Sequence, residues 1–315
     1  MEKQTASRQK KAAPRKPRAP RPPISAQLAE AKAEIARLNA EIEDLRLLYE
    51  GTIEHGEAVE DELADKNILL QKTQKRLDEE LADATRYVIS ILPAPREAAP
   101  ATDWLLVPST ELGGDSFGYH EIDDDHMAFY LLDVCGHGVG AALLSVTAIN
   151  VLRSSALPNT DFRDPAAVLG ALNEAFPMEK QNDMYFTIWY GVYKRSTGQL
   201  SFSSAGHPPS IHLRSGADGI EVAELTAKGV ALGTFPGITY RCVTKEIVPG
   251  DRLLLLSDGT FEVETGPGEM LPFSEFVNFL AAPGGDEPTK IHEWIRSLNG
   301  DGPLPDDFSL LRIVF

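Results

Sequence analysis

Residues 131–142 read LLDVCGHGVGAA and join an apolar segment to a glycine-rich turn and then to a second apolar segment. The apolar run from Met127 to Leu132 predicts a buried strand that ends at one carboxylate, Asp133. Glycines at 136, 138 and 140 let the next turn approach an ion or a phosphate closely, because glycine has no Cβ. A carboxylate beside such a turn suits a hard metal ion. The same residues also suit a buried strand, a turn capped by Asp133 and a core helix, so the stretch alone leaves both interpretations open.

Three further stretches place acidic residues next to predicted strands. Gly113-Gly114-Asp115 precedes an alternating segment, and residues 251–259 (DRLLLLSDG) carry Asp258 to the end of an apolar run. Asp306 and Asp307 come just before the last apolar segment. Mg²⁺ and Mn²⁺ take a few oxygen ligands on rigid elements and keep waters in their other positions. The repeated arrangement therefore predicts a divalent-metal site.

Six motifs follow one another in the second part of the chain: GGD, DVCGHGVGAALL, SAGHPP, GVALG, PGDRLLLLSDGTFE and DDFSLL. In this order and spacing, the chain from about Pro93 to Phe315 resembles the bacterial SpoIIE/RsbU-type branch of the metal-dependent PPM (type 2C-like) serine/threonine phosphatases. The resemblance implies a four-layer α/β/β/α sandwich of the α+β class. It also implies a two-metal hydrolase that acts on phosphoserine or phosphothreonine.

The resemblance also implies roles for individual residues. Its metal carboxylates correspond to Asp115, Asp133, Asp258 and Asp306, and Val134 would offer its backbone carbonyl. Asp133 would bridge two Mn²⁺ or Mg²⁺ ions. Asp133, Asp115 and Asp258 are the expected catalytic residues, acting through a water that the two metals activate, with no covalent nucleophile.

Some residues near these motifs keep alternative interpretations. A local shift in register could exchange Asp306 and Asp307. His137 is either a general acid near the leaving group or a structural turn residue. His207 could suggest a Ser/His hydrolase, but the Gly-x-Ser-x-Gly elbow that such a site needs is absent, which favours a loop-stabilising role. Residues 116–120 depart from the family pattern after GGD, which leaves the details of substrate recognition open.

The N-terminal part of the chain differs in composition. Residues 1–24 contain eight Lys or Arg, one Glu and five prolines, giving a net charge of +7. This composition cannot bury apolar surface and predicts a disordered basic, Pro/Ala-rich tail. The tail either binds nucleic acid, membrane lipid or an acidic partner, or serves only to keep the protein in solution.

Residues 25–92 predict a coiled coil and linker helix. Apolar residues repeat at heptad spacing, namely Leu28, Ile35, Leu38, Ile42 and Leu45. Ile at the first seam position and Leu at the second favour a parallel homodimer. We expect residues 28–91 to form its interface. A solvent-exposed single helix, or a hairpin near residues 51–56, is the alternative. Prolines at 93 and 95 end the helix before the phosphatase domain, residues 93–315.

Residues 93–315 alternate short strand-like segments with a few helical ones. Asp164 and Pro165 are typical of a helix N-cap and first helical position, and residues 240–247 predict a strand. Many short antiparallel strands with two groups of helices indicate a β-sandwich covered by helices. This agrees with the fold that the resemblance implies.

Charge and cysteine content limit the functional classes. The net charge is −17, so the chain beyond residue 24 carries −24 and would repel nucleic acid as a main substrate. The two cysteines, Cys135 and Cys242, favour free thiols in a reducing compartment. No apolar run approaches the roughly 20 residues of a membrane span, and the basic N-terminus lacks a signal-like apolar segment. We therefore expect a cytoplasmic protein.

Two functions from different classes follow. The favoured one is a phosphatase that removes phosphate from serine on a regulatory protein, such as an anti-sigma-factor antagonist of the STAS type. The other is a dimeric coiled-coil signalling scaffold whose phosphatase-like domain binds a partner without turnover. Intact acids at 115, 133, 258 and 306 favour the enzyme.

Overall fold

The computed structural model describes residues 23–109, 112–217, 219–266, 268–300, 302 and 304–315. The predicted disordered tail lies outside these residues, except for Pro23 and Ile24. The chain divides into two compact units, the first ending at Lys75 and the second running from Arg76 to Phe315. None of the helices in the described part of the chain combines the length and the apolar character needed to cross a membrane.

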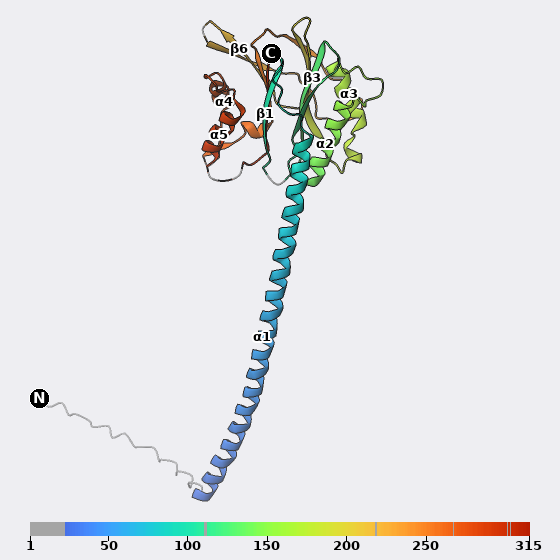
Figure 1. Cartoon of the computed structure of the whole chain (residues 1–315). Helices are drawn as coiled ribbons and strands as arrows, with labels where there is room; N and C mark the ends of the chain where they lie inside the picture. Colours follow the sequence, from blue (N-terminus) through green and yellow to red (C-terminus); the bar gives the residue numbers. More distant parts are fainter. Residues whose placement is uncertain (1–22, 110–111, 218, 267, 301, 303) are drawn as a thin grey trace, which may run out of the picture. The chain divides into compact units, whose positions relative to one another are not determined.

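Helix α1 (Ile24–Ile91) has 68 residues and is continuous through Gly51 and Gly56 (Figure 1). The hairpin alternative is therefore wrong. The described residues bury none of its side chains, and the predicted seam residues are 44% to 63% exposed: Ile35, Leu38, Ile42 and Leu45. An apolar helix face in a protein is normally packed against a partner, and this packing supplies most of the helix's stability. The described residues supply no such partner for this seam.

The last turns of α1 belong to the second unit. Leu81, Ala84, Val88 and Ile91 are half-buried and lie on one face of the helix. Arg153 Nη1 donates a hydrogen bond to the Ile91 carbonyl at 3.1 Å. The chain that follows is anchored in the core, where Leu92 is buried.

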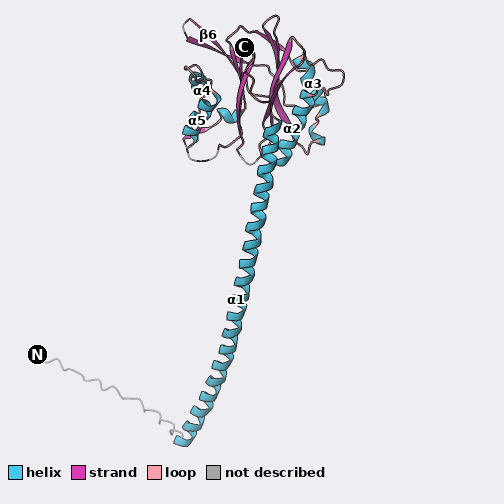
Figure 2. Cartoon of the chain, in the orientation of Figure 1, coloured by secondary structure: helices cyan, strands magenta, loops and turns pink. Residues whose placement is uncertain are grey.

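Two five-stranded antiparallel sheets form the centre of the second unit (Figure 2). The first sheet has the order β1-β12-β9-β6-β7: β1 (Ala101–Val107), β12 (Phe308–Val314), β9 (Arg252–Leu256), β6 (Ser210–Gly216) and β7 (Gly219–Leu225). The second has the order β2-β3-β4-β5-β8: β2 (Ser116–Glu121), β3 (His126–Val134), β4 (Phe186–Lys194), β5 (Gln199–Ala205) and β8 (Val243–Glu246).

Helices cover the outer face of each sheet, as Figure 1 shows. Helices α2 (Val139–Arg153) and α3 (Pro165–Ala175) contact the second sheet, and α4 (Phe273–Leu280) and α5 (Pro288–Asn299) lie over the first. Three hydrophobic cores separate the layers: one under α2 and α3, one between the sheets, and one under α4 and α5. This confirms the predicted α+β class and four-layer α/β/β/α sandwich.

Strand alternation decides which side chains lie between the sheets. In β3, Met127, Phe129 and Leu131 pack between the sheets, whereas the even-numbered residues pack against the helices. A strand sends successive side chains to opposite faces, so the next odd position, Asp133, follows the inter-sheet residues to the end of the strand. Trp189 is likewise an inter-sheet residue of β4, which places Thr187 on the same face.

The boundaries of the elements largely follow the sequence prediction. Asp164 caps α3, where its Oδ1 accepts hydrogen bonds from Ala166 N at 3.0 Å and Ala167 N at 3.3 Å. The predicted strand over 240–247 is too long, because Tyr240 packs into the core under α2 and α3 and only Val243–Glu246 pairs as β8. Four short elements were not predicted: η1 (Met178–Lys180), η2 (Asp258–Thr260), β10 (Glu264–Gly266) and β11 (Glu269–Met270).

Candidate active site

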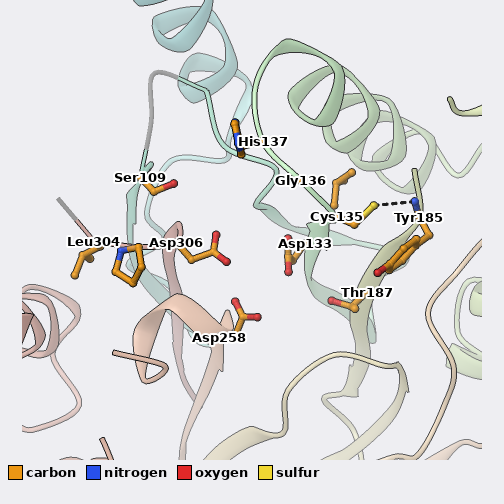
Figure 3. Close-up of a pocket in the computed structure, with 12 residues that line it drawn as sticks. Ser109, Asp133, Cys135, Gly136, His137, Tyr185, Thr187, Asp258, Leu304 and Asp306 are labelled. Atoms are coloured by element: carbon orange, nitrogen blue, oxygen red, sulfur yellow. Dashed lines mark hydrogen bonds between the residues drawn. The ribbon is translucent and has the colours of Figure 1, made fainter. Parts of the chain in front are cut away.

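A pocket of about 570 Å³ lies where β3 ends and β4 and η2 begin, next to the segment before β12. Figure 3 shows the carboxylates of Asp133, Asp258 and Asp306 around the same space. Asp133 ends β3, Asp258 begins η2, and Asp306 precedes β12. Positions separated by more than a hundred residues in sequence therefore meet at one end of the two sheets.

Thr187 shares this pocket with Asp133. The two residues are direct partners in the β3–β4 register, and the Thr187 side chain lies beside Asp133 in Figure 3. Thr187 Oγ1 lies 2.9 Å from His207 Nδ1, which fixes the direction of the hydroxyl. Burial lowers the pKa of His207 to about 3, so this imidazole is neutral near pH 7.

Asp115 is buried and, unlike the other three predicted carboxylates, is not among the residues that line the pocket. Its Oδ2 atom has no hydrogen-bond partner among the described residues. The turn before it passes so close to the end of β3 that a Cβ at Gly114 would lie 2.5 Å from the Val134 carbonyl oxygen. Only glycine allows this approach, so the GGD motif brings Asp115 against the backbone of the strand that carries Asp133.

Asp307 holds the neighbouring loops together. Its Oδ1 accepts hydrogen bonds from Ser109 N at 2.8 Å and Ser109 Oγ at 3.0 Å, and its Oδ2 accepts a long one from Asp115 N at 3.4 Å. Its backbone carbonyl accepts a hydrogen bond from Ser257 Oγ at 3.0 Å. Asp307 is buried, whereas Asp306 is exposed and lines the pocket. The two residues are thus not interchangeable in this structure.

The acids raise one another's pKa. Burial, followed by the charges of Asp258 and Asp306, raises the pKa of Asp133 to about 7. Burial, and then the charge of Asp133, raises the pKa of Asp115 well above its usual value, although Ser309 and Ser257 partly oppose this. Burial and the charge of Asp306 also raise the pKa of Asp258. A compensating positive charge is therefore favoured at this site.

The two histidines lie in different surroundings. His137 is exposed at the pocket margin, and its side chain lies apart from the three carboxylates in Figure 3. His207 is buried in the loop after β5, where Ser204 Oγ donates to its backbone carbonyl at 3.1 Å. The neighbouring Cys135 has a half-buried side chain whose Sγ accepts a hydrogen bond from Tyr185 N at 3.2 Å.

The donor atoms of the pocket suit a hard cation. The carboxylates and the Val134 carbonyl supply oxygen only, and the unpartnered Asp115 Oδ2 is a buried acceptor in need of a positive partner. In the part of the chain that the structure describes, no three His, Cys, Asp or Glu side chains converge closely enough to hold an ion between them. Mg²⁺ usually binds through one or two carboxylates and keeps several waters, so such convergence is not required.

Sequence motifs did not point to Thr187, Ser257 or Ser309. The two serines lower the pKa of buried Asp115. Ser257 Oγ also donates a hydrogen bond to the Asp307 carbonyl at 3.0 Å. Strand alternation was the available signal. Thr187 and Ser309 fall on alternate positions with the inter-sheet residues of β4 and β12, and Ser257, one residue past β9, continues the alternation of Leu253 and Leu255. That signal becomes useful only once the pairing of strands is known.

Comparison with known proteins agrees with this arrangement. Residues 123–315 match the family described as Stage II sporulation protein E (SpoIIE). The chain is 28% identical over 248 residues to the phosphoserine phosphatase RsbU of Bacillus subtilis, covering 77% of this chain and 72% of RsbU. It is also 28% identical over 159 residues to the phosphoserine phosphatase RsbP of the same organism, covering 49% of this chain but only 38% of RsbP.

Solved structures share the fold. The SiaA-PP2C domain of Pseudomonas aeruginosa superposes with a TM-score of 0.64 at 25% identity, covering 77% of this chain and 98% of that domain. The PP2C phosphatase domain of SpoIIE from Bacillus subtilis, with a fragment of its regulatory domain, gives a TM-score of 0.57 at 19% identity, covering 68% and 62%. With a family match over more than half of its length, this chain belongs to the SpoIIE family and is a phosphatase of the SpoIIE/RsbU type with the PPM fold.

Proposed function

We propose that this protein is a metal-dependent protein serine/threonine phosphatase that hydrolyses phosphoserine on a regulatory protein. The observation that carries the proposal is the meeting of Asp133, Asp258 and Asp306 in one pocket, with buried Asp115 close enough to Asp133 for the charge of Asp133 to raise its pKa. Acids that raise one another's pKa in this way are typical of functional sites. No other cluster of acids in the described chain combines burial, mutual repulsion and an open pocket in this way.

The metal ligands in this proposal are the carboxylates of Asp115, Asp133, Asp258 and Asp306 and the backbone carbonyl of Val134. Two Mn²⁺ or Mg²⁺ ions at this site would activate a water and neutralise charge on the phosphoryl oxygens. Without cations the four carboxylates repel one another, so cation binding should stabilise the folded protein.

The protein's other residues orient the substrate. The Thr187 hydroxyl is fixed by neutral His207 on one side and faces the pocket on the other, where it can form a hydrogen bond with a phosphoryl oxygen or the attacking water. Asp307 keeps the turn that carries Asp115 against the segment before β12. The Thr187–His207 contact positions a hydroxyl without adding negative charge to the pocket.

Phosphoserine on a folded partner is the substrate class that fits best. The relatives RsbU and RsbP are named phosphoserine phosphatases. The pocket is open to solvent at exposed Asp306 and His137, which suits a phosphate on a protein surface. A STAS-type anti-sigma-factor antagonist is the regulatory partner we propose, and the acidic body disfavours nucleic acid.

We also propose that α1 mediates a parallel homodimer. Its seam residues are exposed in the single chain, and Ile with Leu at alternating seam positions favours two parallel strands. A partner helix would bury this seam.

Hydrolysis of p-nitrophenyl phosphate by the purified protein tests the proposed chemistry. We expect turnover with Mn²⁺ or Mg²⁺, none with excess chelator, and at least a hundredfold loss in Asp133→Asn and Asp258→Asn. Circular dichroism checks that the variants are folded. Wild-type turnover in the folded variants would contradict the assignment of Asp133 and Asp258 as metal ligands. A wild type that is inert with every metal would favour the scaffold function.

A further inference from the structure

A second cavity continues from the carboxylate pocket. It has a volume of about 440 Å³ and shares Asp133, Thr187 and Asp258 with that pocket. Its remaining lining residues come from the loop after β5, from β7 and from the segment around η2 and α4: Gly206, His207, Pro208, Pro209, Glu224, Phe261, Glu262 and Phe273. We call this cavity the flank groove. A phosphoserine at the carboxylates would therefore have the groove directly beside it.

The walls of the flank groove are apolar and rigid. Pro208 and Pro209 are half-buried and fix the backbone of their loop. The rings of Phe261 and Phe273, which also line the groove, meet edge to face with centroids 5.1 Å apart, and Phe261 also contacts buried Phe276. Such a surface is preorganised, so a bound side chain would not have to order it.

The rim of the flank groove is acidic. Glu224 on β7 and Glu262 after η2 are both exposed. Glu262 lies close enough to the reaction pocket to raise the pKa of Asp258, and its backbone N donates to the Asp258 carbonyl at 2.8 Å. Among the described residues that line either cavity, none is Lys or Arg. The groove therefore favours a cationic ligand and repels an acidic one.

We propose that the flank groove binds the residues next to the phosphoserine of the protein substrate, and that it selects an apolar residue together with a Lys or Arg. The apolar side chain would pack between the proline loop and Phe261, and the basic side chain would reach Glu224 and Glu262. The inference rests on the proposed phosphatase function, which it deepens by naming the chemistry of the substrate sequence. It also explains how an acidic protein can attract one phosphorylated segment rather than any phosphate ester.

Matched phosphoserine peptides test the selection. One set carries Arg and the other carries Glu at the positions flanking the phosphoserine. The remaining residues are apolar and identical in the two sets. We expect kcat/KM of the wild type to be about threefold to tenfold higher for the Arg set, since exposed ion pairs are individually weak. Each kcat/KM is normalised to turnover of p-nitrophenyl phosphate by the same preparation. In Glu224→Lys, the ratio of kcat/KM for the Arg set to kcat/KM for the Glu set should fall to one or below.

A matched control separates the groove from overall charge. Glu221 is exposed on the same strand, β7, but does not line the groove. Glu221→Lys changes the net charge of the protein by the same amount, so it should keep the wild-type ratio. Equal loss of the ratio in both variants would contradict a local groove and indicate long-range attraction only.

Binding without turnover distinguishes failure of the groove from failure of the proposed function. Fluorescence anisotropy of the same labelled peptides on folded Asp133→Asn protein should show the same preference for Arg. Preferential binding of the Arg peptides, with no hydrolysis by the wild type, would support the groove proposal and contradict the phosphatase function. Hydrolysis with equal kcat/KM and equal affinity for both peptide sets would support the phosphatase function and contradict the groove proposal.

Discussion

Thr187 shows how one neutral side chain can matter in an acidic site. It lies opposite Asp133 in the strand register, and its hydroxyl is fixed 2.9 Å from His207 Nδ1. The chemistry of the motifs gives no reason to select it, because threonine is common in strands. Its position follows from alternation, which sends it toward the same space as Asp133.

Replacement of Thr187 tests its role as a positioning residue. Thr187→Val keeps the shape of the side chain but removes the hydroxyl, so we expect kcat to fall about tenfold to a hundredfold. KM and the melting temperature should change little. Thr187→Ser keeps the hydroxyl and should restore kcat to within about threefold, measured by steady-state hydrolysis at saturating metal. Equal losses in the two variants would indicate a packing role instead.

The adjacent acids Asp306 and Asp307 should respond differently to mutation. Asp306→Asn alters an exposed pocket residue, so activity should fall while the free energy of unfolding is unchanged or slightly increased. Asp307→Ala removes the acceptor of hydrogen bonds from Ser109 and Asp115, so it should cost about 2–4 kcal/mol of stability. Urea unfolding together with turnover measures both quantities. The reverse pattern would mean that the register of this segment is shifted.

Between elements, an ion cluster links β6 to the start of β9. Asp251 is buried and accepts hydrogen bonds from His212 Nε2 at 2.9 Å and Arg214 Nη2 at 2.6 Å. Burial alone would raise the pKa of Asp251, but hydrogen bonds from Arg214, Val248 N and His212 outweigh it and lower the pKa to about 2. The carboxylate form is therefore favoured by folding.

This shift predicts an acid-dependent loss of stability. Because the pKa is lower in the folded state than the usual value of 3.8, the stabilisation is complete above about pH 4 and disappears as the pH falls toward 2. Its size is roughly 2 kcal/mol. In Asp251→Asn, that part of the pH dependence should be absent when unfolding is measured by circular dichroism between pH 2 and pH 5. A wild-type slope in the variant would exclude Asp251 as its source.

Helix α1 presents an apolar seam that the described chain does not cover. Replacing Ile35, Leu38, Ile42 and Leu45 with Lys should convert a dimer into monomers, because like charges would face each other in the seam. The matched control replaces Ala29, Ala33, Ala36 and Ala40, which lie on other heptad positions, with Lys. Light scattering after size-exclusion chromatography should report a dimer for the wild type and the control. A monomeric wild type would remove the dimer proposal.

At the level of the whole molecule, the motif order and strand patterns predicted the sandwich and four residues that line the pocket, namely Asp133, Val134, Asp258 and Asp306. The sequence favoured Asp306 but left an exchange with Asp307 open, since the choice depends on which side chain meets Ser109 across the fold. It also overextended the strand before β9, because tertiary packing of Tyr240 interrupts an apolar pattern that favours a strand. Thr187 was missed because its importance arises from pairing between strands, not from a local motif.

Phosphate release from a phosphoserine-containing STAS-type protein tests the central claim most directly. The wild type should release phosphate in proportion to added Mn²⁺ or Mg²⁺, and both chelation and Asp133→Asn should abolish the release. DNA and RNA in parallel reactions should remain intact. Metal-independent release, or equal release by folded Asp133→Asn, would contradict a metal-dependent phosphatase centred on these carboxylates.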